Sequence, residues 1–263
     1  MTKSRDTANI IKQPFTQTLG TSNYRAGVNA GNSITSGGNY NVTVGDEAGT
    51  AITTGDYNTA VGMDSAKAIT TGIKNTAIGS TALDAEVAGN YSTAIGMGAL
   101  TTQSQSGDVD VYNTAVGYLA GGAVTTGTLN TFVGGLAGDA LTVGGSNVSL
   151  GYFSLTADTK GSKSVAVGTA ALGDQNFTSA TDAFNVAIGQ EAGRSVTTGT
   201  LNTLIGGLAG DAITTASATT AIGQGALSAC TTASNNVAVG QDRGFEIKHH
   251  RIQQHGGWVS GWV

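Results

Sequence analysis

A five-residue pattern of polar, β-branched, small, aliphatic and glycine positions recurs along most of the chain. Its copies read approximately Asn-Thr-Ala-Val-Gly, and successive copies are 17 residues apart, except for two spacings of 21. A weaker copy ends at Gly27, 18 residues before the first regular one. Self-similarity at such a period is the signature of a repeat architecture, in which each repeat is one structural unit. The twelve regular glycines are Gly45, Gly62, Gly79, Gly96, Gly117, Gly134, Gly151, Gly168, Gly189, Gly206, Gly223 and Gly240.

The hydrophobic alternation within each copy predicts a short strand. The β-branched and aliphatic positions lie two residues apart and so share one face of an extended backbone. The residue between them is usually alanine, with Phe132 and Leu204 as larger exceptions. We expect this small residue to face outward and the aliphatic residues to face the core. The glycine is expected to end the strand, at a bend that a Cβ would obstruct.

A second apolar position follows the glycine in one of two ways. Some units carry the aliphatic residue four positions after the glycine, as at Leu83, and others carry it seven positions after, as at Ile52. We infer one inward slot per coil, filled from either position, with Cys230 as a small apolar filler. Units of the second kind continue as Ile-Thr-Thr, which predicts a second short strand closed by a turn glycine such as Gly55.

A unit of 17 residues is too short to hold a crossover helix, but stacked coils can pair each strand with its equivalent above and below. The sequence therefore predicts an all-β fold, a parallel β-solenoid of about twelve coils flattened into a roll. At ~4.8 Å per coil the rod is about 58 Å long. The asparagine that begins most copies is expected to form a hydrogen-bonded ladder rather than a binding site. This column comprises Asn41, Asn58, Asn75, Asn113, Asn130, Asn147, Asn185, Asn202 and Asn236.

A longer period places two insertions at equivalent points of the rod. Three units of 17 and one of 21 make a block of 72 residues, and the extra residues fall within 101–112 and 173–184. Insertions in a solenoid become loops on one side, often the binding side. We therefore regard the acidic and aromatic residues of these loops as candidates for receptor contact, through a calcium or a glycan. The simpler alternative is a tolerated, solvated insertion. The candidates are Asp108, Asp110, Tyr112, Asp174, Asp182 and Phe184.

Composition narrows the function classes. Glycine occupies 41 of 263 positions and charged residues only 11%, with a net charge of −5. The acidic balance argues against nucleic-acid binding, and no apolar stretch approaches the ~18 residues of a membrane helix. No nucleophile motif, phosphate loop or metal-spaced ligand set is present. We therefore expect neither an enzyme nor a cofactor. A carboxylate pair that cleaves polysaccharides and an ice-binding threonine surface are the minor alternatives.

The last 23 residues break the repeat and concentrate the rare side chains. All three histidines and both tryptophans of the chain lie there. We divide the chain into an N-terminal attachment segment (1–22), a solenoid (23–240) and a C-terminal cap or tip (241–263). A cap over the last open coil is the preferred interpretation, with contact of a receptor by the tip as the alternative. The candidates are Trp258 and Trp262 for contact, and His249, His250 and His255 as weak candidates for a metal on a threefold axis.

The balance of burial against entropy predicts that the chain does not stand alone. Each coil buries only a few aliphatic side chains, each worth roughly 1.5–3 kcal/mol. Ordering its backbone costs roughly 1–2 kcal/mol per residue. A face of small alanines permits close approach of another chain, so we expect a homo-oligomer, with three copies favoured. A monomeric solenoid is the alternative.

Two copies of the repeat, Asn113-Thr114-Ala115-Val116-Gly117 and Ser164-Val165-Ala166-Val167-Gly168, resemble the head repeats of trimeric autotransporter adhesins. The same style of repeat occurs in phage tail-fibre proteins. The resemblance covers about residues 27–240 and implies a left-handed parallel β-roll with three chains around an axis. The unit of 17 residues is longer than the usual adhesin repeat.

The start of the chain, Met1 to Asn9, resembles the segment by which phage fibres attach to the virion. We find no secretion signal, stalk heptads or membrane anchor in the sequence, which favours the phage interpretation. The expectation is a non-catalytic virion tail fibre, assembled in the host cytoplasm. It would bind tail or baseplate proteins through its N-terminus and a glycan or protein on the host surface. The alternatives are a bacterial adhesin head and a capsid-decorating fibre without a receptor role.

Overall fold

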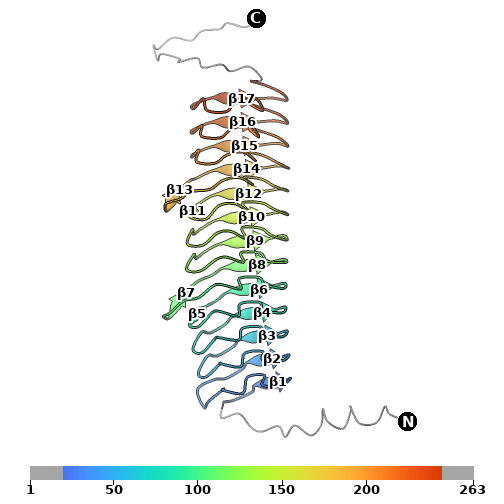
Figure 1. The fold of residues 1–263 in the computed structure, drawn as a ribbon, viewed down its shortest axis with the longest axis vertical. Coiled ribbons are helices and arrows are strands. Elements are labelled where there is room, and N and C mark those ends of the chain that lie inside the picture. Colours follow the sequence, from blue (N-terminus) through green and yellow to red (C-terminus); the bar gives the residue numbers. More distant parts are fainter. Residues whose placement is uncertain (1–19, 245–263) are drawn as a thin grey trace, which may run out of the picture.

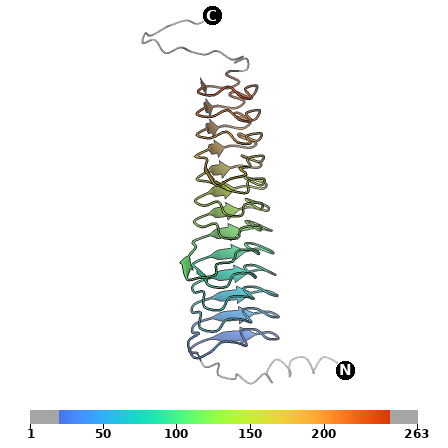
Figure 2. The same cartoon turned by 60° about the vertical axis from the view of Figure 1, so that its left-hand side comes forward.

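The computed structural model describes residues 20–244 and shows, over that range, an all-β chain without helices. Thirteen short strands form one parallel sheet, in which each strand pairs with its counterparts in the coils before and after it. Figures 1 and 2 show the result as a slender stack of similar coils. The strands are β1 (Tyr24–Ala26), β2 (Val42–Val44), β3 (Thr59–Val61), β4 (Thr76–Ile78), β6 (Thr93–Ile95), β8 (Thr114–Val116), β9 (Thr131–Val133), β10 (Val148–Leu150), β12 (Val165–Val167), β14 (Val186–Ile188), β15 (Thr203–Ile205), β16 (Thr220–Ile222) and β17 (Val237–Val239).

The strand register follows the sequence repeat. Thr59 pairs with Thr76, and Val61 pairs with Ile78, so residues 17 apart stack directly on one another. The longer units keep the same register, because Thr93 of β6 pairs with Thr114 of β8. The predicted parallel β-solenoid is confirmed, and the weak copy before Gly27 supplies its first strand, β1.

The two insertions form small projections on the same side of the rod. In the first, β7 (Val109–Asp110) pairs with β5 (Gly89–Asn90) of the preceding coil, and in the second, β13 (Thr181–Asp182) pairs with β11 (Gly161–Ser162) of the preceding coil. Both pairs stand out on the left in Figure 1. The prediction that the insertions lie on one side is confirmed.

The predicted facing of the main strands is wrong. The central alanine, as in Ala60 and Ala77, is fully buried, while the aliphatic residue beside it is partly exposed, to 38% at Ile78. The cause is the width of the coil interior, which leaves room for a methyl group between the opposing walls. Phe132 fits inward because Gly121 leaves space: a Cβ there would lie 2.8 Å from the phenylalanine ring. The same holds for Leu204 opposite Gly210, again at 2.8 Å.

The prediction of one inward slot per coil, filled from either of two positions, is wrong, because both positions point inward. Leu83, four positions after its glycine, and Ile52, seven positions after, are both fully buried in the same continuous core. In the coil of Leu83 the seventh position is Glu86, which is also fully buried. Leu227 and Cys230 likewise occupy both positions of one coil, at 0% and 2% exposure. Cys230 is therefore a buried filler, as predicted, in an inward position of its own.

The predicted second strand over Ile-Thr-Thr does not form. Residues 52–54 have no strand geometry, although they do stack from coil to coil. The amide N–H groups of Thr53 and Gly55 both donate to the carbonyl oxygen of Thr70, at 2.9 and 3.2 Å. The Thr53 hydroxyl donates to the same oxygen at 3.1 Å. Because one carbonyl takes all three bonds, the segment forms a stacked bend rather than a strand.

The asparagine column forms hydrogen bonds between side chain and backbone. Asn41 Oδ1 accepts a bond of 2.9 Å from the backbone N–H of Asn58 in the next coil, and Asn58 Nδ2 donates to the carbonyl of Gly72 at 2.8 Å. The same donation to a turn carbonyl recurs at Asn75, Asn113, Asn130, Asn147, Asn185 and Asn202. Asn236 instead bonds within its own coil, to Ala233 at 2.7 Å.

Candidate binding surfaces of the rod

The outward face of the main sheet is a repetitive surface that extends along the described rod. It consists of the first and third residues of the strands from β2 to β17, and none of them is charged. Seven of these positions are threonine and the others are valine, isoleucine or leucine. Ile78 and Ile188 are 38% and 39% exposed. An uncharged, largely aliphatic strip therefore follows the length of the rod.

The first insertion brings three of the predicted contact residues together. Asn90 Nδ2, on β5, donates to Asp108 Oδ1 at 2.6 Å and to Asp110 Oδ1 at 3.2 Å. The Tyr112 ring is stacked on Tyr91 of the preceding coil, with centroids 5.0 Å apart. The carboxylates are thus engaged by an amide, and the aromatic ring of Tyr112 has one face covered.

A cation completes this group. Lys74 Nζ lies 3.0 Å from the Tyr91 hydroxyl and 4.8 Å from the centre of its ring. The hydrogen bond to Tyr91 raises the pKa of Lys74, and desolvation together with Asp110 raises the pKa of Tyr112. Lysine and tyrosine therefore keep their ordinary neutral-pH forms, and the group presents hydroxyls, an ammonium and carboxylates to solvent.

The second insertion repeats the arrangement with different residues. Lys163 Nζ lies 2.6 Å from Asp182 Oδ2 and 5.1 Å from the centre of the Phe184 ring. Asp182 and Phe184 are one 72-residue period after Asp110 and Tyr112. The structure therefore brings together Asp108, Asp110 and Tyr112 at one projection, and Asp182 and Phe184 at the other.

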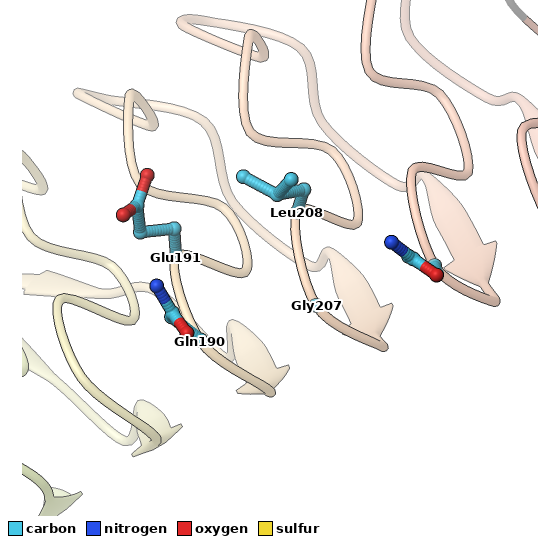
Figure 3. Close-up of a pocket in the computed structure, with 5 residues that line it drawn as sticks. Gln190, Glu191, Gly207 and Leu208 are labelled. Carbon is cyan, nitrogen blue, oxygen red and sulfur yellow. The ribbon is translucent and has the colours of Figure 1, made fainter.

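Asp174 lies apart from both groups, in a surface depression that we name the corner groove. The depression follows the bends after β10, β12 and β14, and its volume is about 440 Å³. An adjoining hollow of about 520 Å³, shown in Figure 3, shares Glu191 with it. The groove comprises Tyr152, Phe153, Thr156, Thr169, Ala170, Gly173, Asp174, Glu191 and Arg194, and the adjoining hollow comprises Gln190, Glu191, Gly207, Leu208 and Gln224.

Sequence reasoning missed a buried polar cluster beneath each insertion. Glu86 Oε1 accepts backbone N–H bonds from Val87, Gly89 and Gln105 at 2.7 to 3.0 Å, and its other oxygen accepts one from Gln103. Asp158 and Gln175 repeat this pairing one period later, at 2.6 Å. All four acidic and amide side chains are fully buried. The available signal was their position, seven after the repeat glycine, where other coils carry an aliphatic residue.

These clusters also replace a missing asparagine. Ser92 stands in the asparagine column, and the Gln103 amide bridges the Ser92 hydroxyl at 2.9 Å and Asn113 Nδ2 at 2.9 Å. A hydroxyl is too short to make the asparagine's bonds, so the glutamine of the next coil occupies the space. Glu86 and Gln103 are fully buried and bond to backbone and side chains at the base of the insertion. We therefore assign this cluster a structural role, which is to fix the base of the insertion to the rod.

The remaining predictions fall on the chain ends. Trp258, Trp262, His249, His250 and His255 lie outside the described residues, as does most of the segment 1–22. Within residues 20–244, no three His, Cys, Asp or Glu side chains cluster closely enough to hold a metal ion. The same range contains no helix of the length and apolarity needed to cross a membrane.

No family model matches this chain, and neither a curated protein nor a solved structure is significantly similar.

Proposed function

We propose that this chain is a structural, non-catalytic fibre protein, a virion tail fibre whose rods associate in threes and serve attachment to a host surface. The observation that carries the proposal is the outward face of the main sheet, an uncharged aliphatic and threonine strip from β2 to β17. Soluble monomers rarely expose a contiguous apolar patch of more than a few hundred Å². A partner that covers this strip would remove it from water.

A second copy of the chain is the partner that matches the strip best. The two outward columns repeat at every coil, so parallel copies present the same aliphatic spacing to one another along the whole rod. The absence of charge means that identical faces meet without like-charge repulsion. The threefold number and the attachment role come from the resemblance of the repeat to phage fibres and adhesin heads. The aliphatic face replaces the alanine face that the sequence suggested for this contact.

Light scattering coupled to size-exclusion chromatography tests the assembly. The native protein is expected at three times the chain mass of 26.1 kDa. Ile95→Asp and Ile188→Asp, on the outward face, are expected to reduce the mass to that of one chain. Leu201→Asp is the matched control, because Leu201 is 58% exposed but lies outside this face. A single-chain mass for the native protein contradicts the proposal.

Immunogold electron microscopy of particles that carry the chain tests the attachment role. Antibodies against the described solenoid are expected to label fibres of the virion tail. Purified protein is expected to compete with these particles for adsorption to host cells. Label on the capsid, or on a bacterial cell envelope, contradicts the tail-fibre proposal and leaves the assembly result unaffected.

A further inference from the structure

The corner groove arises because one coil lacks large side chains where its neighbours have them. Tyr152, Thr169 and Gln190 are the first residues after successive repeat glycines, and Phe153, Ala170 and Glu191 are the second. Backbone hydrogen bonds stack these corners directly: Ala170 N–H donates to Tyr152 O at 3.0 Å, and Glu191 N–H donates to Thr169 O at 2.8 Å. At the corner itself the middle coil contributes only the small residues Thr169 and Ala170, so it forms the floor of a slot.

The width of the slot follows from the stacking distance. Coils are ~4.8 Å apart, so the corners on either side of the middle coil are separated by about 9.6 Å. Non-bonded atoms approach to about 3.5–4.0 Å on each side. This leaves the thickness of one puckered or planar ring between the two walls. Gly173 extends the floor, since it stands where the flanking coils carry Thr156 and Arg194.

The two walls differ in chemistry. One is aromatic: the rings of Tyr152 and Phe153 meet edge to face with centroids 4.3 Å apart, and Tyr152 is 55% exposed. The other is charged: Arg194 Nη1 lies 3.1 Å from Glu191 Oε2. Asp174 stands between them, with its N–H bonded to the Arg194 carbonyl at 2.9 Å. Such a slot suits a ring with an apolar C–H face and a rim of hydroxyl groups, since aromatic rings cover the former and guanidinium and carboxylate groups bond the latter.

The adjoining hollow is also formed by a coil with a small residue between two coils with larger ones, and here the larger side chains carry amide groups. Gly207 contributes no side chain between Gln190 and Gln224, which stand at the same position of the coils before and after it. Figure 3 shows Gln190 and Glu191 on one coil and Leu208 beside Gly207 on the next. This hollow lies two coils, about 9.6 Å, from the first. Together they offer successive polar and apolar contacts along the rod axis.

We propose that the corner groove is a carbohydrate site, which holds a pyranose ring between Tyr152–Phe153 and Glu191–Arg194 and the next part of an oligosaccharide toward Gln224. This gives a ligand class to the attachment role proposed above and rests on that role for its biological meaning only. The groove is formed by residues after the strands and not by the outward face, so its binding can be measured whatever the number of chains.

Filling the empty layer is the sharpest test. Leucine occupies the position of Ala170 in other coils, as Leu136 and Leu208, with the same left-handed φ of 57° and 59°. Ala170→Leu is therefore compatible with the fold and closes the slot. Thr81→Leu is the matched control, because it introduces leucine at the same coil position outside the groove. Saturation-transfer NMR would use methyl glucoside, methyl galactoside, methyl mannoside and methyl N-acetylglucosaminide on the full-length protein.

The expected result is saturation transfer to at least one of these pyranosides from the native protein and from Thr81→Leu. Ala170→Leu and Tyr152→Ala are expected to reduce that signal at least fivefold. No transfer from the native protein to any of the four overturns the proposal, and so does equal transfer from native protein and Ala170→Leu. Either outcome leaves the proposed assembly untouched, because the light-scattering mass of the native protein and its outward-face variants tests that assembly independently.

Discussion

At the scale of single residues, the repeat glycine is fixed by the coil above it. Gly62 has a φ of 130°, and a Cβ on it would lie 2.6 Å from the carbonyl carbon and oxygen of Gly79. The obstacle is thus the backbone of the neighbouring glycine, which has no room to retreat because it meets the next glycine in turn. The sequence predicted a bend at this point, and stacking explains why glycine alone fits it.

Gly62→Ala is accordingly expected to destabilise the protein by at least about 3 kcal/mol, in the range of severe backbone substitutions. Gly107→Ala is the matched control, because a Cβ at Gly107 meets nothing within 4 Å. Urea denaturation followed by circular dichroism measures both. Equal midpoints for the two variants contradict the steric argument.

Asp211 offers a prediction about pH. Its Oδ1 is buried without a hydrogen-bond partner, and desolvation raises the pKa of its carboxyl above the ordinary value. A raised pKa in the folded state means that the folded protein binds the proton more tightly, so stability falls as pH rises through the unfolded and then the folded pKa. Asp211→Asn is therefore expected to melt higher than the native protein at pH 7.

The advantage of Asp211→Asn is expected to shrink at pH 3, where the native carboxyl is protonated. Asp139→Asn is the control, since Asp139 stands at the same coil position but accepts a hydrogen bond from Thr156. Scanning calorimetry at the two pH values measures the difference. A gain for Asp211→Asn that is as large at pH 3 as at pH 7 contradicts desolvation as the cause.

At the scale of the element, the sequence was sufficient for the strand and its register but not for its facing. Alternation shows that Thr59 and Val61 share a face, yet it is silent on which face is the core. The volume available inside the coil decides which face points inward. The sequence contained one clue: Phe132 replaces the usual alanine in a coil where Gly121 and Gly138 leave room for an inward-pointing ring. The strand predicted over the Ile-Thr-Thr segment is absent for a different reason. Its β-branched residues favour an extended backbone, but two backbone N–H groups and a hydroxyl share the carbonyl of Thr70, where a strand ladder would pair each N–H with its own carbonyl.

The asparagine column is the element that ties coils together, and its removal has a calculable cost. Asn58→Ala leaves the N–H of Asn75 and the carbonyl of Gly72 without partners inside the coil. Each unpaired buried group costs about 1–3 kcal/mol, so the expected loss of stability for the two groups is about 2–6 kcal/mol. Asn236→Ala, which loses only bonds within its own coil, to the Ala233 carbonyl and more weakly to the Cys230 sulfur, is expected to cost less than half as much. Chemical denaturation of the two variants gives the comparison, and similar losses would show that the bonds between coils add little.

At the scale of the whole molecule, the candidate sites divide between what repeats and what does not. The outward face follows from the repeat, and the sequence predicted which residues share that face, although it predicted them to point into the core. The insertion residues Asp108, Asp110 and Tyr112 were found because the 21-residue spacing marks them. The corner groove was missed because it depends on three small residues in one coil between larger ones in its neighbours, a contrast that appears only when coils are stacked. Asp174 alone was identified there, and for its place in the insertion.

A solenoid whose coils contact only their neighbours should tolerate the loss of one complete coil. Deletion of residues 63–79 joins Gly62 to Ser80, which reproduces the natural junction of Gly79 with Ser80. Strand β3 then pairs with β6, and Ser92 follows Asn58 in the asparagine column as it follows Asn75 in the native chain. The variant is expected to keep a cooperative melt and to form a rod shorter by ~4.8 Å in small-angle scattering.

The control is a deletion of residues 63–71, about half a coil. It shifts alanine and valine positions out of register and is expected to abolish folding. If both deletions unfold the protein, stability depends on contacts beyond neighbouring coils, and the one-dimensional description of the rod is wrong.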